Sequence, residues 1–451
     1  MTPTPLYLLY KDHRGNSIYI KRDDLLPFSF GGNKVRIAEA FFQHMERLGK
    51  NCIIGYGNAR SNLSRAIANM AAAKGICCHI ISPDDEDGTR SETSNSRIVS
   101  SCGAVFHTCP KTQVSQTVDH VMASCLAQGL SPYYIYGDRF GKGNEATPVA
   151  AYAKAYGEIR MQAPTELDLI FLPTGTVMNH AGLLAGQAAS GGSEQIIGIS
   201  VARSKEAETE ILKNYVNSYI KKTNCASIST ERYYVTDSYL CGGYGCYDER
   251  ISEVISRIMR SYGVPLDPTY TGKAFYGMEQ WLEEHDVREK NILFLHTGGT
   301  PLYFDHLAQG PVTMCKDKAQ LLRFLQRIDH QLPTPLSDRV ELESYARKAL
   351  TCGHILGIEK NAELICAAMF YCNDTQTRQA YLTLLGTLEG HEHRGYAGRV
   401  LSAAEASCAR NGMLALHLDT EHTNHDAIRF YKKHGYKETA SGQKLHLVKE
   451  L

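Results

Sequence analysis

The first 310 residues alternate short apolar runs with longer stretches in which apolar side chains recur every three or four positions. Short runs bounded by glycine or polar residues predict buried strands, as at Cys52–Tyr56 and Leu169–Leu172. The stretches between such runs have helical spacing, as at Val35–Leu48 and Asn58–Ala73. This alternation predicts an α/β fold with mostly parallel sheets. Further strands are predicted at Ser17–Lys21, Ile76–Ser82, Ala104–Phe106, Ile196–Val201 and Ile292–His296, and a further helix at Arg90–Ser101.

The pattern changes beyond Gly310. The turn sequence Gln309-Gly310-Pro311 interrupts the alternation, and Asp317–Asp329 has the spacing of an amphipathic helix. Strands are then predicted at Ala362–Tyr371, Tyr381–Leu385 and Leu414–Leu418. With 451 residues, the chain also exceeds the size of about 250 to 300 residues at which one hydrophobic core stops growing. We therefore predict two domains, residues 1–311 and 312–451.

Composition and charge narrow the range of partners. Apolar residues make up 43% of the chain, and 48 basic residues balance 48 acidic ones, so nothing favours nucleic acid or an anionic membrane. No charged-then-apolar leader and no membrane-spanning apolar run are recognisable, which leads us to expect a cytoplasmic protein with a small substrate. The 14 cysteines lack the short paired spacings of a zinc site, so we expect reduced core residues and no metal.

The segment Gly31-Gly32-Asn33-Lys34 places a lysine in the first turn of a predicted helix. Two glycines permit a sharp turn, and the positive end of the helix dipole disfavours an ammonium group. If Lys34 is also buried, its pKa is lowered and its amine can act as a nucleophile toward a carbonyl cofactor. A lysine beside a glycine turn that simply points into water explains the same residues equally well.

Two other predicted helix starts carry small polar residues after a strand. The first includes Ser61 and Asn62, and the second runs from Thr174 through Gly175, Thr176 and Asn179. Backbone N–H groups and hydroxyls at such a helix start can hold a phosphate group. An ordinary capped helix accounts for the first of these two stretches as well.

Residues 1 to about 308 resemble the family of D-cysteine desulfhydrases and 1-aminocyclopropane-1-carboxylate (ACC) deaminases. These enzymes use pyridoxal phosphate and have the tryptophan-synthase-β fold, known as fold type II, with two open α/β subdomains. The resemblance implies that Lys34 forms a Schiff base with the cofactor and that Asn62 contacts the cofactor ring oxygen. It further implies that Ser61 and Tyr270 flank the substrate and that the protein is a homodimer. The matching segments are Lys21–Asp24, Gly31–Lys34, Ser61–Asn62 with Arg65, Thr174–Thr176 with Ala181–Leu183, Gly243–Gly245, Asp267–Pro268 and Tyr270–Lys273.

By the same resemblance, the loop from Thr174 to Asn179 holds the cofactor phosphate. Val177 and Met178 stand where the family usually has two glycines. The deaminases have a glutamate after the tyrosine, positioned beside the pyridine nitrogen, and here that residue is Thr271. A neutral partner resembles the desulfhydrase branch and suits β-elimination, which needs a weaker electron sink.

Residues 318 to about 446 resemble GNAT-type N-acetyltransferases, which have an α+β fold and use acetyl-CoA. A turn of small residues with arginines at a helix start suits a pyrophosphate. The resemblance implies that this turn binds acetyl-CoA and that Tyr431 protonates the departing thiolate. Glu392 stands where the family usually has glutamine or arginine, and Arg394 compensates for its charge. The residues implied in acetyl-CoA binding are Arg394, Gly395, Tyr396, Ala397, Gly398 and Asn424.

Together the two resemblances predict a bifunctional enzyme. The first domain would eliminate from, or deaminate, a small amino acid, with β-replacement as a variant, and the second would acetylate a small amine. Our hypothesis is that both domains act on one amino acid. Two alternatives stay open: the first domain is a ligand-binding module that regulates the acetyltransferase, or the acetyl acceptor is unrelated to the first domain.

Overall fold

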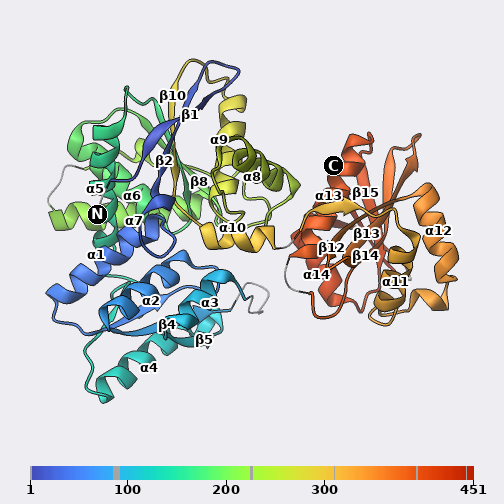
Figure 1. Cartoon of the computed structure of the whole chain (residues 1–451), viewed down its shortest axis with the longest axis horizontal. Helices are drawn as coiled ribbons and strands as arrows, with labels where there is room; N and C mark the ends of the chain where they lie inside the picture. Colours follow the sequence, from blue (N-terminus) through green and yellow to red (C-terminus); the bar gives the residue numbers. More distant parts are fainter. Residues whose placement is uncertain (1–2, 85–91, 224–226, 309, 393–394, 443) are drawn as a thin grey trace. The chain divides into compact units, whose positions relative to one another are not determined.

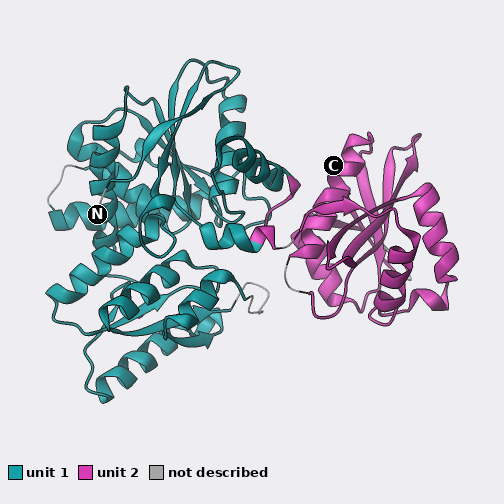
Figure 2. Ribbon diagram, in the orientation of Figure 1, with its two compact units in different colours: residues 1–245, 250–305 teal, residues 246–249, 306–451 magenta. Residues whose placement is uncertain are grey.

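A computed structural model describes residues 3–84, 92–223, 227–308, 310–392, 395–442 and 444–451. These residues form two compact units (Figures 1 and 2). Unit 1 contains residues 1–245 and 250–305, and unit 2 contains residues 246–249 and 306–451. The predicted boundary at residue 312 stays a prediction.

Unit 1 contains a large sheet with the strand order β1-β2-β10-β7-β8-β9. Neighbouring strands in it run parallel, except that β1 pairs antiparallel with β2. Alternation of strands and helices along the chain requires such crossovers, so the predicted mostly parallel sheet is confirmed. The strands are β1 (Leu6–Lys11), β2 (Ser17–Arg22), β7 (Leu169–Thr174), β8 (Gln195–Ser200), β9 (Tyr234–Thr236) and β10 (Asn291–His296).

A small sheet with the order β5-β4-β3-β6 is the second sheet of unit 1, and all its pairs are parallel. Its strands are β3 (Cys52–Tyr56), β4 (Cys77–Pro83), β5 (Val105–Cys109) and β6 (Pro132–Tyr134). The helices from α1 to α5 are α1 (Asn33–Arg47), α2 (Asn62–Lys74), α3 (Ser94–Ser101), α4 (Val114–Ala127) and α5 (Ala146–Gln162). Those from α6 to α10 are α6 (Met178–Ser190), α7 (Lys205–Thr223), α8 (Glu249–Tyr262), α9 (Thr271–Glu284) and α10 (Thr300–Leu307).

Unit 2 contains a mixed sheet with the order β11-β12-β13-β14-β15-β17-β16. Only the β14–β15 pair is parallel among the pairs of this sheet in the described residues. The strands are β11 (Val312–Met314), β12 (His354–Lys360), β13 (Glu363–Asp374), β14 (Gln379–Thr387), β15 (Ala415–Thr420), β16 (Lys437–Ser441) and β17 (Leu445–Glu450). The helices are α11 (Lys318–Asp329), α12 (Leu342–Cys352), α13 (Tyr396–Arg410) and α14 (His425–Lys433).

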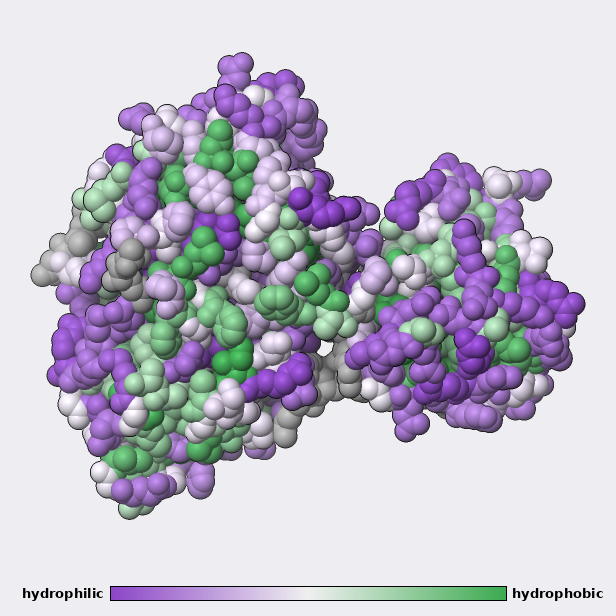
Figure 3. Space-filling model, viewed as in Figure 1, coloured by the Kyte–Doolittle hydropathy of each residue, from purple (hydrophilic) through white to green (hydrophobic). Residues whose placement is uncertain are grey.

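The face of the molecule drawn in Figure 3 differs in hydropathy between the two units. On the face drawn in Figure 3, hydrophobic residues gather mainly over unit 1, while unit 2 presents mostly hydrophilic ones. Within the described ranges, no helix combines the length and the apolar character that a bilayer crossing requires.

Candidate active site

Lys34 lies in the first turn of α1, as the sequence predicts, and the turn before it requires glycine. Gly31 and Gly32 have φ values of 65° and 100°. A Cβ atom on Gly31 would lie 2.0 Å from the backbone oxygen of Asp24, and one on Gly32 would lie 2.9 Å from that of Thr297. The chain therefore passes closely between η1 (Asp23–Leu25) and the end of β10, which fixes where α1 begins.

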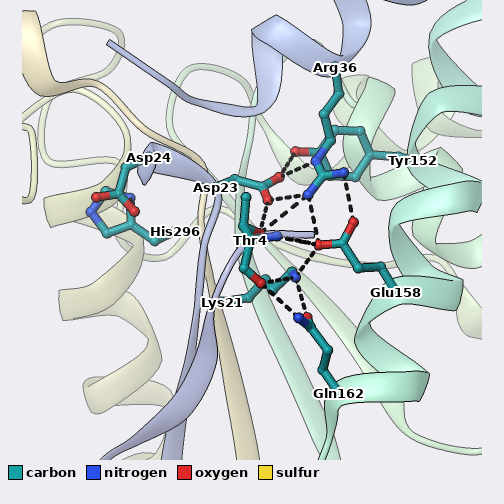
Figure 4. Close-up of polar contacts among 9 residues, drawn as sticks. All are labelled: Thr4, Lys21, Asp23, Asp24, Arg36, Tyr152, Glu158, Gln162 and His296. Atoms are coloured by element: carbon teal, nitrogen blue, oxygen red, sulfur yellow. Dashed lines mark hydrogen bonds and ion pairs between the residues drawn. The ribbon is translucent and has the colours of Figure 1, made fainter. Parts of the chain in front are cut away.

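A buried network of charged and polar side chains holds this start of α1 (Figure 4). Arg36 donates to Asp23 at 2.8 Å and to Glu158 at 2.9 Å, so it ties η1 to α5. Lys21 also pairs with Glu158, and it donates to the backbone oxygen of Thr4 at 2.7 Å. Because Arg36 is only two residues after Lys34, the network fixes the helix turn that carries the lysine.

Asp24 belongs to a second, neighbouring set of contacts. Arg22 donates two hydrogen bonds to its carboxylate, at 2.8 and 2.7 Å. His296 lies 3.5 Å from the same carboxylate, accepts from the backbone N–H of Gly298 at Nδ1, and has the oxygen of Pro265 3.0 Å from Nε2. His296 therefore connects the carboxylate of Asp24 to the glycine turn beside Gly32.

The predicted phosphate loop lies at the carboxyl end of β7 and leads into α6. Thr174 is the last residue of the strand and is buried, while Thr176 is exposed in the loop. Lys34 Nζ donates to Thr176 Oγ1 at 3.1 Å, which brings together two motifs 142 residues apart. Desolvation by the surrounding protein lowers the pKa of the half-buried Lys34 to about 8. Arg203, after β8, donates to the backbone oxygen of Gly175.

The two residues that stand where the family resemblance leads us to expect glycines are buried in the protein core. Val177 and Met178 are fully buried members of the hydrophobic core of unit 1. Val177 nevertheless has φ 53° and ψ −3°, so a β-branched residue occupies the left-handed region. Asn179 is buried in the first turn of α6 and donates to the oxygen of Pro173 at 3.4 Å. The loop thus keeps a backbone turn of the kind that glycine favours, while the side chains of Val177 and Met178 pack into the core.

Ser61 and Asn62 begin α2 just beyond the carboxyl end of β3. Ser61 is the N-cap residue, and its hydroxyl accepts from the backbone N–H of Ser64 at 3.1 Å. The side-chain oxygen of Asn62 accepts from Asn95 at 3.0 Å and from Arg65 at 3.4 Å. Because both bonds engage the oxygen, they orient the Asn62 amide so that its NH₂ group is left to serve a ligand.

Tyr270 is the N-cap residue of α9, and Thr271 is the first residue of that helix. The hydroxyls of Tyr270 and Tyr244 lie 2.6 Å apart, and burial raises the pKa of Tyr270 well above its usual range. The Thr271 hydroxyl donates to Asp267 at 2.8 Å and accepts from the backbone N–H of Asp267 at 2.8 Å. Thr271 is fully buried, so its hydroxyl keeps at most one lone pair for a ring nitrogen.

The donor groups of this region fit pyridoxal phosphate. The first N–H groups of α6 have no partner inside the helix, and with the two threonine hydroxyls they suit a phosphate dianion. Lys34 has an amine of lowered pKa that would suit the aldehyde, and Asn62 has an amide that would suit the ring oxygen. All of these groups follow carboxyl ends of parallel strands, the edge at which open α/β sheets bind ligands.

The residues that carry the acetyltransferase resemblance lie at two helix starts of unit 2. Gly395, with φ 82°, precedes α13, whose first residues are Tyr396, Ala397 and Gly398. Asn424 is the N-cap residue of α14, and its side chain accepts from the backbone N–H of Ala427 at 3.2 Å. Arg394 lies outside the described residues.

Tyr431 lies in α14 and is buried in the hydrophobic core of unit 2, where its ring is 5.5 Å from that of Tyr436. Burial raises the pKa of the Tyr431 phenol, so the hydroxyl keeps its proton at neutral pH.

Unit 2 also contains a pocket that the sequence did not indicate. Its volume is about 400 Å³, and its lining includes Gln379, Tyr381, His417 and His446. His446 donates to Asp419 at 2.7 Å, and its other ring nitrogen lies 3.0 Å from Nδ1 of His417. Gln379 is the first residue of β14, whereas the predicted acetyl-CoA turn follows the last residue of that strand. The pocket therefore lies at the opposite edge of the sheet from the turn.

Several residues of the candidate site escaped the sequence analysis. Arg36, Glu158 and Asn95 support the site through contacts between segments far apart in the chain, and no local pattern marks them. Tyr244 was visible as part of a glycine-rich loop, but its pairing with Tyr270 was not.

Comparison with known proteins gives two family matches. Residues 1–298 match the family model described as pyridoxal-phosphate dependent enzyme, and residues 321–436 match the acetyltransferase (GNAT) family. The two models match in the order, and over the parts of the chain, that the sequence resemblances predicted.

Three solved structures that are similar to this chain each match about two thirds of it. An ACC deaminase homologue is 27% identical, with a TM-score of 0.60, and the match covers 68% of this chain and 93% of that chain. An O-ureido-L-serine synthase is 14% identical, with a TM-score of 0.48, covering 68% of this chain and 94% of that chain. Threonine deaminase isoform 2 from Solanum lycopersicum is 17% identical, with a TM-score of 0.46, covering 66% and 79%.

Proposed function

The chain belongs to the pyridoxal-phosphate dependent enzyme family and carries a GNAT acetyltransferase domain, and we propose that unit 1 eliminates a β-substituent from a small amino acid. The proposal rests above all on one contact. Lys34 Nζ lies 3.1 Å from Thr176 Oγ1 in the loop proposed to hold the phosphate, and its pKa is lowered to about 8. A reactive amine therefore lies within reach of the position that the cofactor aldehyde needs.

Bound pyridoxal phosphate supplies a carbonyl for the substrate amine and an electron-withdrawing ring that stabilises charge at the α carbon. Lys34 Nζ removes the proton from the α carbon, because a pKa of about 8 leaves an appreciable neutral fraction near pH 7. The N-terminus of α2 at Ser61 binds the substrate carboxylate through backbone N–H groups. Lys34 thus acts on the α carbon of the small substrate, while the start of α2 binds its carboxylate.

Tyr270 and Tyr244 are the proposed proton donors to the leaving group. Their oxygens are 2.6 Å apart, so one hydroxyl donates to the other, and burial raises the pKa of Tyr270, so its phenol is protonated at neutral pH. For a cysteine-like substrate, the Cβ–S bond breaks with its electron pair on sulfur, which takes a proton. The unsaturated amino acid that remains then reacts with water to give a keto acid and ammonia.

Elimination is favoured over ring-opening deamination by the environment of Thr271. This residue is neutral, and it directs its own proton to Asp267, so it provides no acid beside the ring nitrogen. A weaker electron sink suits loss of a good β leaving group. β-Replacement differs only in what attacks next, and it would leave the amino-acid amine in place.

For unit 2 we propose acetyl transfer from acetyl-CoA to the amine of a small amino acid. The start of α13 at Gly395 offers backbone N–H groups to the pyrophosphate, and Tyr431 offers a protonated phenol to the leaving thiolate. If unit 1 carries out replacement, its product retains an amine that unit 2 can acetylate. The two units would then act on one amino acid in a cytoplasmic homodimer.

The first experiment is a visible absorption spectrum of the purified protein beside Lys34→Ala, with and without added pyridoxal phosphate. We expect a yellow band in the parent protein that is lost in the variant and shifts with one amino acid in a panel that includes D-cysteine. Keto acid and ammonia formation should fall by at least about 10²-fold in the variant. A protein that stays colourless with added cofactor would contradict the proposal and favour a regulatory role for unit 1.

Acetyl transfer needs a separate assay, because sulfide released by unit 1 would react with reagents that detect free CoA. Mass spectrometry of the acetylated amine avoids this interference. Tyr431→Phe should slow acetylation by about 10²- to 10⁴-fold and leave keto acid formation unchanged. If no amino acid, and no product of one, is accepted by both units, the shared-substrate proposal is wrong even though each activity stands. Light scattering of the same preparation tests the homodimer.

A further inference from the structure

Three cysteines and a histidine come together in the small sheet of unit 1, away from the candidate active site. One ligand atom each of Cys52, His79 and Cys125 lies within 4.8 Å of the others. Cys77 is not one of these three residues, but it lies beside them, because its sulfur is 3.4 Å from Nε2 of His79. Cys52 and Cys125 are fully buried, and no disulfide links any of the four.

Two separations among these atoms match the edges of a metal tetrahedron. The Cys52 and Cys125 sulfurs are 3.8 Å apart. Zinc–sulfur bonds of about 2.3 Å and zinc–nitrogen bonds of about 2.0 Å place ligand sulfurs about 3.8 Å apart and a sulfur and a nitrogen about 3.5 Å apart. The observed separations of 3.8 and 3.4 Å agree with both values.

The histidine is also held as a metal ligand is usually held. While Nε2 of His79 faces the cysteines, its Nδ1 lies 2.9 Å from Nε2 of His107 on β5. With His79 Nδ1 as the donor, Nε2 presents a lone pair to the sulfurs. Metal-bound histidines commonly donate their second ring nitrogen to such an outer partner, which fixes the ring and its tautomer.

The register of the parallel strands β3 and β4 brings these side chains together. Cys52 and Cys77 are the first residues of β3 and β4 and are aligned partners in that parallel pair. His79 lies two positions along β4 and therefore on the same face, and α4 brings Cys125 over that face. The cluster lies at the amino ends of the strands, whereas Ser61 and Asn62 follow the carboxyl end of β3. A role in structure, separate from catalysis, follows from that position.

We propose that Cys52, Cys77, His79 and Cys125 bind one zinc ion, with His107 as the positioning residue for His79. Three thiolates and one imidazole in a tetrahedron favour zinc over hard cations such as magnesium. With Cys77 moved in as the fourth ligand, no position is left for water, so the site is structural. The ion would join β3, β4 and α4 and release the thiol protons to solvent on binding.

Metal analysis of the full chain, purified without chelators, should find about one zinc per chain. Replacing zinc with cobalt should give intense visible d–d bands, which lie at longer wavelength than pyridoxal absorption and are typical of a tetrahedral site rich in thiolate. Removal of the metal should lower the melting temperature of the protein. These readouts do not depend on catalytic activity.

Variants of single ligands give the matched comparison. Cys77→Ser and Cys125→Ser should lose the cobalt bands, and His107→Ala should weaken metal affinity by about 10- to 100-fold. Cys78→Ser is the control, because Cys78 is buried on β4 between two ligand residues but points to the other face of the sheet. That variant should keep its full metal content.

Three outcomes would overturn the proposal. The parent protein could hold no zinc and give no cobalt bands when cobalt is added to the reduced protein. The Cys78→Ser variant could lose as much metal as Cys125→Ser. Mass mapping of freshly purified protein could find Cys52 and Cys125 joined in a disulfide, which would assign the close pair to redox chemistry instead. If the ligand variants fail to fold, metal content and cobalt spectra of the parent chain still decide.

Discussion

Lys34 and Val177 both adjoin a tight turn at the start of a helix, but the two turns are built differently. Directly before α1, Gly31 and Gly32 have positive φ, and their missing side chains allow the backbone to approach Asp24 and Thr297; Ser29 and Phe30, earlier in the same turn, have φ values of 47° and 58°. Before α6 the residue with positive φ is Val177, whose side chain is packed in the core. The residues directly before α1 are glycines, which adopt positive φ without strain, whereas the residue directly before α6 is a buried valine.

The difference extends to what holds each side of the site. On the lysine side, buried ion pairs link Arg36 to Asp23 and Glu158, so the position of Lys34 is fixed before any ligand binds. On the phosphate side, the loop offers unpaired helix N–H groups that a dianion would satisfy. We infer that the protein prepares its lysine in advance and leaves the phosphate loop to be completed by the cofactor.

The largest effect should come from breaking the ionic network. Arg36→Met leaves Asp23 and Glu158 buried without one of their cations, which should lower the free energy of unfolding of unit 1 by about 3–5 kcal/mol. Trp281 is the single tryptophan of the chain and lies in α9, so its fluorescence during urea unfolding reports on unit 1.

Arg139→Met provides the control for that measurement. Arg139 pairs with Asp119 at 2.5 Å, but both side chains are about half exposed, so the loss should be about 0–1 kcal/mol. Equal losses in the two variants would show that the network near Lys34 does not contribute more than a surface ion pair.

A smaller effect tests the lowered pKa of the Lys34 amine. Because the pKa of Lys34 is lowered to about 8, the rate at which the apoprotein captures pyridoxal phosphate should fall about tenfold for each pH unit below 8 and level off above it. The sign follows from protonation, since only the neutral amine attacks the aldehyde. Stopped-flow absorbance gives the profile, and a simple alkylamine in the same buffers serves as the reference. A rate that keeps rising as far as pH 10 would show an ordinary lysine.

The sequence predicted the local parts of this site and missed the parts that depend on distant contacts. Glycines before Lys34 and the cap at Ser61 act within a few residues, so their pattern is visible in the chain. Lys34 and Thr176 come from segments 142 residues apart, and only the family resemblance linked them. Cys52 and Cys125 are 73 residues apart and belong to no such resemblance, so their proximity emerged only from the fold.

The same limit applies to conformation. The sequence analysis placed Val177 and Met178 in the phosphate loop, but it could not tell where their side chains point. The structure packs both into the core, so burial of apolar surface supports a backbone conformation that local preference opposes.

The smallest predicted effect tests whether the left-handed backbone conformation at Val177 is strained. At most buried helical positions alanine is more stabilising than glycine by about 0.5–1 kcal/mol, because glycine loses more backbone freedom on folding. At Val177, with φ 53°, the order should reverse: both Val177→Ala and Val177→Gly lose core contacts, but only the glycine variant removes the left-handed strain of about 1 kcal/mol. Ala181→Gly in the same helix should follow the ordinary order and lose stability. Urea unfolding followed at Trp281 compares all three. If Val177→Ala is the more stable of the two Val177 variants, the turn before α6 carries no strain, and the contrast between the two sides of the site is wrong.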